Sequence, residues 1–256
     1  MLAAERRATI ARLAKQHGSV RVGELGQQFD VTEETIRRDL EELEQGGYLK
    51  RTYGGAVSIN GTGLELPFAR RVASHLEEKS AIASYAATLI QEGETIILDA
   101  STTALWLAKR LIERRDLTVV TTSLQIVMEL AGRPGIRVIC TGGNLRDRTL
   151  AFVGPLAERA IQGYYVDKVF MSGKGLTPEG GLTDSNELEV ELKKTMLAAG
   201  KAKIALVDSS KMGHRAFAQI ADVGEFAQII TDTGIDSEMA RAIGENGGIL
   251  TIAQLE

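Results

Sequence analysis

From residue 79 onward, β-rich apolar runs alternate with helical segments, and this alternation constrains the fold more than any other feature of the sequence. The runs are nearly continuous in apolar character, and helical patterns lie between several of them. Such strands are typical of a parallel sheet that helices cover on both faces. We therefore predict an α/β domain over residues 67–256. Its strands are expected at residues 95–99, 117–122, 137–140, 168–171, 203–207 and 228–231, and helices at 79–91, 104–113 and 186–199.

Length and composition fit a chain of two folded domains. At 256 residues and 27.6 kDa, the chain exceeds the roughly 100–200 residues of a single domain. A hydrophobic fraction of 44% and a charged fraction of 25% are ordinary for a globular protein, which disfavours a disordered or rod-like chain. The longest uncharged stretches, such as residues 117–128, fall short of the roughly 18–20 apolar residues that cross a bilayer.

Cysteine and histidine usage argues against a structural metal. A single cysteine, Cys140, excludes an internal disulfide, and the three histidines lack metal-ligand spacing. The first residues run directly into a charged periodic segment, without the apolar core of a secretory signal. We therefore expect a cytoplasmic protein with no membrane segment, no metal and no cofactor.

The N-terminal segment, residues 1–59, has the pattern of a helix-turn-helix. Apolar residues recur at helical spacing in two short segments, and Gly18 is a stop signal between them. Thr32 is a good N-cap for a third helix, which ends at two consecutive glycines. A tight turn between two short helices is typical of the motif that seats a recognition helix in the DNA major groove. The expected helices cover residues 5–17, 22–29 and 32–46.

A glycine-tipped hairpin is expected directly after the third helix. Gly54 and Gly55 supply the positive φ that a tight hairpin turn needs, so residues 48–59 read as a wing. The first 59 residues carry nine Lys/Arg and nine Asp/Glu, so the whole net charge of −4 lies in the remainder. Because this segment has no net charge, DNA binding must depend on where its basic side chains lie. We expect the basic groups of the wing and of the third helix to converge on phosphates.

The arginines of the third helix also permit a simpler interpretation. Glu33 and Arg37, like Glu34 and Arg38, are i, i+4 pairs that would stabilise any exposed helix. A solvated helix face therefore competes with a DNA-reading face. The helix spacing, the Thr32 cap and the wing together favour DNA.

The motifs at residues 31–40 and 49–56 resemble the signature of the DeoR family of bacterial transcription regulators. This resemblance implies a winged helix-turn-helix DNA-binding domain at residues 1–59, followed by a linker at residues 60–66. The residues expected to contact double-stranded DNA are Thr32, Glu34, Thr35, Arg37, Arg38, Lys50, Arg51, Tyr53, Gly54 and Gly55.

Polar residues follow several of the predicted strands. In parallel sheets, ligands bind at the carboxyl ends of the strands, so these segments are expected to share one rim. Hydroxyls that open a helix suit an anionic group, and paired glycines let the backbone approach a ligand. Each segment could equally be an ordinary helix cap or turn. The segments are residues 99–103, 141–144, 172–175 and 208–211.

Several further side chains have a structural interpretation. Glu187 and Lys194 can belong to the solvated face of a helix, and Lys79 is expected at the surface or in an ion pair. Trp106 and Phe152 are expected in the core.

The motifs at residues 98–103, 141–143, 181–187 and 208–211 resemble those of the DeoR family's C-terminal sensor domain. That domain is similar in fold to ribose-5-phosphate isomerase, and members of the family typically sense phosphorylated sugars through it. The resemblance implies that Ser101, Thr102 and Thr103 bind the phosphate. Other residues are expected around the sugar: Thr141, Gly142, Asp184, Glu187, Lys194, Asp208 and Lys211. Asp99, Gly143 and Lys174 join this set from the same strand ends.

We therefore predict a transcription regulator rather than an enzyme. The expected protein is a repressor of a sugar-metabolism operon, modulated by a phosphorylated sugar. Because an operator with two half-sites needs two reading heads, we expect a homo-oligomer, either a dimer or a tetramer. The alternative is a sugar-phosphate isomerase with an accessory domain, whose general base would be Asp99, Asp184, Glu187 or Asp208.

Overall fold

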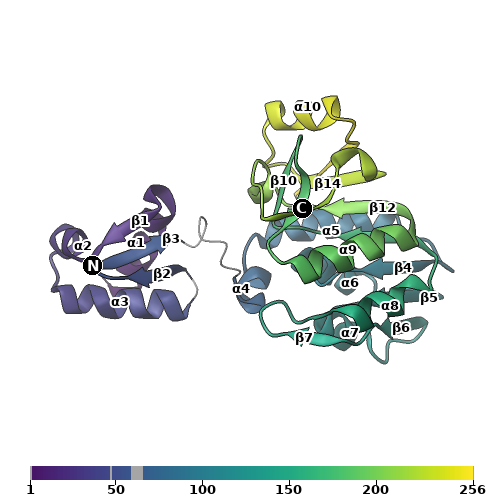
Figure 1. The fold of residues 1–256 in the computed structure, drawn as a ribbon, viewed down its shortest axis with the longest axis horizontal. Coiled ribbons are helices and arrows are strands. Elements are labelled where there is room, and N and C mark those ends of the chain that lie inside the picture. The colour runs from purple at the N-terminus through teal and green to yellow at the C-terminus, as the bar shows by residue number, and fades with distance from the viewer. Residues whose placement is uncertain (1, 47, 59–65, 256) are drawn as a thin grey trace. The chain divides into compact units, whose positions relative to one another are not determined.

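The computed structural model describes residues 2–46, 48–58 and 66–255. The chain divides into two compact units, Met1–Arg70 and Arg71–Glu256, which are described separately (Figure 1). Of the predicted linker, residues 60–65 lie outside the described residues. Within the described ranges, no helix is both long and apolar enough to pass through a membrane.

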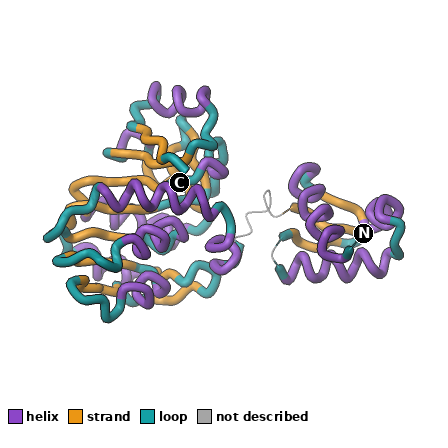
Figure 2. The backbone as a smooth tube through the Cα atoms, turned by 180° about the vertical axis from the view of Figure 1, so that it is seen from behind, coloured by secondary structure: helices purple, strands orange, loops and turns teal. Residues whose placement is uncertain are grey.

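The N-terminal unit is a winged helix-turn-helix. Its helices pack on an antiparallel sheet of order β1-β3-β2 (Figure 2). The turn between the second and third helices is made at Asp30, whose φ of 50° lies in the left-handed region that Asp tolerates. The core includes Ile10, Leu25, Ile36 and Leu40. The elements are α1 (Ala3–His17), β1 (Ser19–Arg21), α2 (Val22–Phe29), α3 (Glu33–Gln45), β2 (Leu49–Thr52) and β3 (Gly55–Ser58).

Strand β1 was not part of the sequence prediction. Its three residues include one buried apolar side chain, Val20, which is too short a pattern to indicate a strand. It becomes a strand because it pairs with β3, where Val20 lies opposite Ala56.

The two wing glycines serve different purposes. Gly54 has a φ of 81° and makes the hairpin turn as predicted. The expectation of a positive φ is wrong for Gly55, which already belongs to β3. A Cβ at Gly55 would lie 2.1 Å from the carbonyl oxygen of Val20, so glycine is needed there because β1 packs so close.

The larger unit is built on a seven-stranded parallel sheet of order β15-β14-β12-β9-β4-β5-β6, which confirms the predicted α/β class. Helices α5, α6 and α7 pack on one another in one layer, and α8 packs on α9 in a second (Figures 1 and 2). The sheet strands are β4 (Thr95–Leu98), β5 (Leu117–Thr121), β6 (Ile136–Cys140), β9 (Val166–Met171), β12 (Gly200–Leu206), β14 (Gln228–Asp232) and β15 (Leu250–Ala253). The α-helices are α4 (Phe68–Ala73), α5 (Leu76–Thr88), α6 (Thr102–Arg110), α7 (Leu124–Leu130), α8 (Pro155–Gln162), α9 (Glu187–Ala199) and α10 (Ser237–Glu245).

Two small antiparallel sheets follow the carboxyl ends of the large sheet. They were not predicted, because their strands are only three or four residues long. One contains β7 (Asn144–Arg146) and β8 (Ala151–Val153). The other contains β10 (Gly175–Thr177), β11 (Gly181–Asp184) and β13 (Ala218–Ala221). Short 3-10 helices lie at Ser209–Lys211 (η2) and Val223–Glu225 (η3).

Candidate functional site

Helix α3 presents a polar face opposite a buried stripe. The Thr32 side chain caps it by accepting a hydrogen bond from the Thr35 amide at 3.3 Å, which confirms the predicted N-cap. Ile36, Leu40 and Leu43 are buried in the core of the unit. Since successive helical residues are about 100° apart, Arg38 points away from that core.

The arginines of α3 are held in exposed ion pairs. Arg37 Nη2 lies 2.7 Å from Glu33 Oε2, and Arg38 Nε lies 3.5 Å from Glu34 Oε1. The Arg38 side chain is 77% exposed. Exposed pairs of this kind contribute little to stability, typically about 0–1 kcal/mol, so a phosphate could replace the carboxylate at small cost. Both interpretations of this face, solvated or DNA-reading, are therefore compatible with the geometry.

The two basic residues of the wing differ in their surroundings. The Arg51 amide donates to Glu44 at 2.8 Å, and its guanidinium Nε lies 3.0 Å from the same carboxylate. Arg51 therefore lies beside the C-terminal end of α3, about two turns from Arg37, and its convergence with Arg37 on DNA phosphates stays a prediction. Lys50 is exposed on β2, and Tyr53 is fully exposed at the wing tip.

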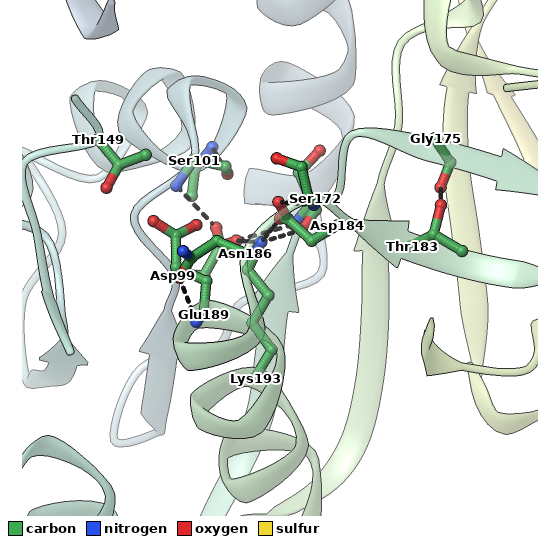
Figure 3. Close-up of polar contacts among 12 residues, drawn as sticks. Asp99, Ser101, Thr149, Ser172, Gly175, Thr183, Asp184, Asn186, Glu189 and Lys193 are labelled. Atoms are coloured by element: carbon green, nitrogen blue, oxygen red, sulfur yellow. Dashed lines mark hydrogen bonds and ion pairs between the residues drawn. The ribbon is translucent and has the colours of Figure 1, made fainter. Parts of the chain in front are cut away.

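In the larger unit, Asp99 joins two neighbouring strand ends (Figure 3). Its carboxylate accepts hydrogen bonds from the Ser101 amide and from the Ser172 amide, each at 3.1 Å. Ser101 follows β4 and Ser172 follows β9, which are adjacent in the sheet. The predicted rim therefore begins at a buried carboxylate that two backbone amides hold in place.

Lys193 is the buried cation of this rim, and the sequence prediction missed it. Its ammonium donates to Asp184 Oδ2 at 2.6 Å and to the Ser172 carbonyl at 2.8 Å (Figure 3). It also lies 3.6 Å from Asp99 Oδ2. Burial would lower the pKa of Lys193, but the carboxylates of Asp184, Asp99 and Glu189 raise it above its ordinary value. Burial would likewise raise the pKa of Asp184, but the Lys193 ammonium holds it below its ordinary value.

The predicted Lys194, about 100° further round α9, lies on the exposed face of the helix. Its side chain is 48% exposed and pairs with Glu191 at 2.9 Å. Lys193 shares the buried face of α9 with Glu189 and Met196, which stand at i−4 and i+3. That helical spacing was the signal in the sequence that distinguishes the two lysines.

On the same helix, the buried glutamate is not the one that the sequence predicted. Glu187 lies exposed in the first turn of α9, whereas Glu189 is buried and forms an ion pair with Arg146 of β7. Neither Glu189 nor Arg146 was predicted. The Asn186 side chain caps the helix by accepting from the Glu189 amide at 3.2 Å.

The N-terminus of α6 opens at the rim with three hydroxyl residues. Ser101 is the N-cap, and its hydroxyl accepts from the Ala104 amide at 3.1 Å, so that hydroxyl is engaged in capping. Thr102 and Thr103 occupy the first turn, where backbone amides have no acceptor within the helix. Thr103 is fully buried, and its Oγ1 has no hydrogen-bond partner among the described residues. This helix end has the donors that an anionic group would need.

Asp208 and Lys211 form the next part of the rim. Lys211 Nζ lies 3.1 Å from Asp208 Oδ2 and donates to Ser172 Oγ at 3.0 Å, which connects η2 to the end of β9. Burial would raise the pKa of Asp208, but the Lys211 ammonium and the Ser210 hydroxyl lower it to about 2. Asp232, which was not predicted, accepts from the Ser209 amide at 2.7 Å and fixes the start of η2.

The remaining predicted residues lie at the strand ends, where their backbone groups hold the loops in place, and the Lys174 ammonium also helps to lower the pKa of Asp184. The Thr141 amide bonds to the Thr121 carbonyl at 3.2 Å, and the Lys174 amide bonds to the Thr183 carbonyl at 2.8 Å. Gly142 and Gly143 have φ values of 65° and 115°. A Cβ on Gly143 would lie 2.8 Å from the Val153 carbonyl oxygen, whereas Gly142 has no atom within 4 Å of such a Cβ. Of this pair, Gly142 is the one with room for a ligand.

Three structural expectations need correction. Lys79 is not at the surface, since it is 2% exposed and its ammonium donates to the carbonyl oxygens of Arg71 and Ser74. Trp106 and Phe152 are only partly buried.

Among the described residues, no group of three or more His, Cys, Asp or Glu side chains is arranged to hold a metal ion.

Comparison with known protein families identifies both units. The DeoR-like helix-turn-helix domain matches residues 6–62, and the DeoR C-terminal sensor domain matches residues 74–233. The chain belongs to the DeoR family. It is a transcription regulator with an N-terminal DNA-binding domain and a C-terminal sensor domain.

Curated relatives match this DeoR-family chain over nearly its whole length. The HTH-type transcriptional regulator YulB of Bacillus subtilis is 45% identical over 243 residues, covering 95% of this chain and 94% of the relative. GolR of Listeria innocua is 39% identical over 250 residues, covering 98% of both chains. The L-fucose operon activator of Haemophilus influenzae is 34% identical over 243 residues, covering 95% and 97%. These relatives are regulators, which contradicts the isomerase alternative.

A solved structure also matches part of this chain, at lower identity. Ribose 5-phosphate isomerase A from Methanocaldococcus jannaschii matches with a TM-score of 0.41 and 20% identity, covering 54% of this chain and 55% of that chain.

Proposed function

We propose that this regulator represses a sugar-metabolism operon and that a phosphorylated sugar, bound at the sensor rim, modulates its hold on the operator. The observation that carries the proposal is the opening of α6, where two first-turn threonines stand at the strand ends beside a cluster of paired charges. Support also comes from relatives whose names refer to sugar operons, such as the L-fucose operon activator of Haemophilus influenzae. A regulator of this kind acts on DNA in the cytoplasm.

The phosphate is assigned to the N-terminus of α6. Thr102 and Thr103 offer backbone amides without intrahelical acceptors, and the positive end of the helix dipole favours an anion. The Thr103 hydroxyl is buried without a partner among the described residues, so it can bond an incoming oxygen. The Ser101 hydroxyl caps α6 by accepting from the Ala104 amide, so we assign it no contact with the phosphate.

The sugar is assigned to the carboxylates and ammonium groups that follow β9 and β12. Lys193 and Lys211 are already paired with carboxylates, so neither offers an unpaired charge to a phosphate. Carboxylates accept hydrogen bonds from hydroxyls, and ammonium groups donate to them. A neutral polyol fits this chemistry better than a second anion.

The DNA-reading role is assigned to α3 and the wing. Arg38, which is exposed on the outer face of α3, is the leading candidate for a base or phosphate contact, and Arg37 adjoins it. Two half-sites need two heads, so we propose a dimer or tetramer. The sugar phosphate can release DNA only if it binds more tightly to the conformation that binds DNA poorly.

A thermal-shift panel tests the assigned ligand class. The full-length protein is melted with a set of aldose and ketose phosphates, with the matching unphosphorylated sugars and with inorganic phosphate. A ligand that binds only the folded form raises the melting temperature by mass action. A shift from at least one sugar phosphate that exceeds those of its parent sugar and of phosphate is expected. A panel without any such difference would remove the phosphorylated sugar from the proposal.

A double substitution locates the phosphate. Thr102→Val with Thr103→Val removes both hydroxyls and keeps the shape of each side chain. The variant is expected to bind a promoter fragment from its own gene neighbourhood as the parent does, but to lose the response to the sugar phosphate that gave the thermal shift. Release of DNA at the parental ligand concentration would contradict the assignment. Lys194→Met, which alters an exposed lysine outside the cluster, is the matched control and should respond normally.

A further inference from the structure

The β7–β8 hairpin begins just after Gly142, the strand-end glycine that has room for a ligand. Its second strand is anchored at the end of β5, where the Phe152 amide donates to the Thr122 carbonyl at 2.7 Å. The Leu124 amide donates to the Leu150 carbonyl at 3.0 Å in the same region. In the sheet, β5 is the neighbour of β4, which leads into α6. The hairpin therefore lies next to the strand end from which the proposed phosphate site opens.

The first strand of the hairpin has little apolar packing of its own. It pairs with β8 in a two-stranded sheet, and such a sheet is at best marginally stable by itself. Asn144 and Leu145 are exposed, so burial of their side chains does little to hold the strand. Arg146, the last residue of β7, is partly buried, and its contacts therefore matter for where β7 lies.

Arg146 connects the hairpin to α9. Its guanidinium donates to the Glu189 carboxylate, 43 residues away in the chain, and at 3.4 Å to the Thr149 hydroxyl in the hairpin turn. The side chains of Arg146 and Glu189 are 21% and 8% exposed, so solvent screens their ion pair only in part. Glu189 stands one helical turn before Lys193, whose ammonium donates to Asp184 at 2.6 Å. The hairpin is thus attached to the helix that carries the buried cation of the rim.

We propose that Arg146 and Glu189 are positioning residues of the sensor rim: their ion pair fastens the β7–β8 hairpin to α9 and so fixes the Gly142 loop in the arrangement that binds a sugar phosphate. On one side of this loop, the Thr141 amide bonds to the Thr121 carbonyl at 3.2 Å, and on the other side the chain enters β7. Breaking the ion pair loosens the second side and leaves the first intact. The fastening is a property of the folded chain, whereas its consequence for ligand binding rests on the proposed function.

Hydrogen exchange of the full chain, without an effector, tests the fastening. Glu189→Gln keeps the shape of the side chain and removes its charge. It is expected to speed exchange in peptides covering residues 144–150 by about tenfold, the effect of weakening one hydrogen bond between charged groups. Glu191→Gln is the matched control, since Glu191 is exposed on the same helix, and it should leave these peptides unchanged. No change in Glu189→Gln, or an equal rise in peptides of the buried strand β4, would overturn the proposal.

A double-mutant cycle distinguishes a shared ion pair from two independent contributions. Arg146→Met and Glu189→Gln each remove one partner, so the double variant is expected to exchange its hairpin peptides about as fast as the faster single variant. Arg146→Lys keeps the positive charge but loses the planar fork of nitrogens, and its exchange should lie between those of the parent and Arg146→Met. Additive effects of the two single changes would overturn the proposal. If Arg146→Met fails to fold, the cycle is run with Arg146→Lys in its place.

The sign of the change in ligand affinity tests the positioning role. The probe is the sugar phosphate with the largest thermal shift in the panel. Removing the negative charge of Glu189 would by itself favour an anion, so a purely electrostatic role predicts tighter binding in Glu189→Gln. Loss of position instead predicts binding that is weaker by about tenfold, the equivalent of one lost hydrogen bond to a charged group.

Tighter or unchanged binding in Glu189→Gln would overturn the positioning role, and Glu191→Gln should bind the probe as the parent does. Failure of the proposed function appears separately, as a parent protein that responds to no sugar phosphate. In that case the exchange experiments still decide whether the ion pair fastens the hairpin.

Discussion

The recognition helix and the sensor rim use the same ionic chemistry in opposite environments. On α3, Arg37 and Arg38 pair with glutamates on the same helix, and every side chain involved is more than half exposed. At the rim, Lys193 joins Asp184 and Asp99 from separate elements, with side chains 8%, 1% and 1% exposed. Pairs of the first kind can be exchanged for DNA phosphates at little cost. Pairs of the second kind hold the site together and cannot be given up singly.

The largest expected effect comes from breaking the buried pair. Lys193→Met leaves the Asp184 carboxylate buried without its cation, which typically costs about 3–5 kcal/mol in the free energy of unfolding. Urea denaturation followed by circular dichroism measures this loss. The neighbouring Lys194→Met should change the free energy of unfolding by less than about 0.5 kcal/mol, since Lys194 pairs only at the surface. Similar losses in the two variants would contradict the distinction between the two environments.

Removing an exposed arginine should affect DNA binding and leave stability nearly intact. Arg38→Ala is expected to weaken operator binding by about 1–3 kcal/mol if the side chain reads a base, with an equal effect on all sequences if it contacts phosphate. Gel shifts over a range of salt concentrations distinguish these cases, since loss of a phosphate contact lowers the salt dependence. Unchanged affinity would remove Arg38 from the interface.

Acid should destabilise the sensor unit through Asp208. The pKa of Asp208 in the folded protein, about 2, lies below its ordinary value of 3.8. Its contribution of about 2 kcal/mol is therefore complete above about pH 4 and is lost as the pH falls toward 2. Asp208→Asn should flatten this part of the stability curve, measured as the urea midpoint between pH 2 and 5. If Asp208→Asn left the pH dependence of the urea midpoint unchanged, the Asp208–Lys211 pair would not contribute this stability.

The smallest expected effect comes from the exposed pair at the start of α3. Glu33→Gln removes the nearer glutamate partner of Arg37, with Glu34 remaining 3.9 Å away, and should cost only a few tenths of a kcal/mol in unfolding free energy. The same change removes a negative charge beside the expected DNA surface, so operator affinity should rise slightly. Thermal melts and gel shifts check the two expectations, and a loss of stability above about 1 kcal/mol would show that this pair resembles the buried ones.

Helix α9 shows how far a sequence pattern reaches. Its position follows from local spacing and appears in the structure, where Asn186 caps the helix. The two adjacent lysines are chemically identical in the sequence, and the buried stripe that includes Leu192 and Met196 shows which one turns inward. Glu189 lies on the same buried face and was also missed, because the resemblance pointed to Glu187, the last residue of the motif at residues 181–187.

The sequence by itself determined the helix-turn-helix, the glycine-tipped wing and the parallel sheet, because these depend on helical periods, caps and apolar runs within short stretches. Tertiary structure decided which charges are buried. In the folded chain, the Lys79 ammonium donates to the carbonyls of Arg71 and Ser74, and Arg51 pairs with Glu44. The physical reason is that burial and ion pairing depend on packing between elements, and for Asp99 and Lys193 the partners stand far apart in the chain.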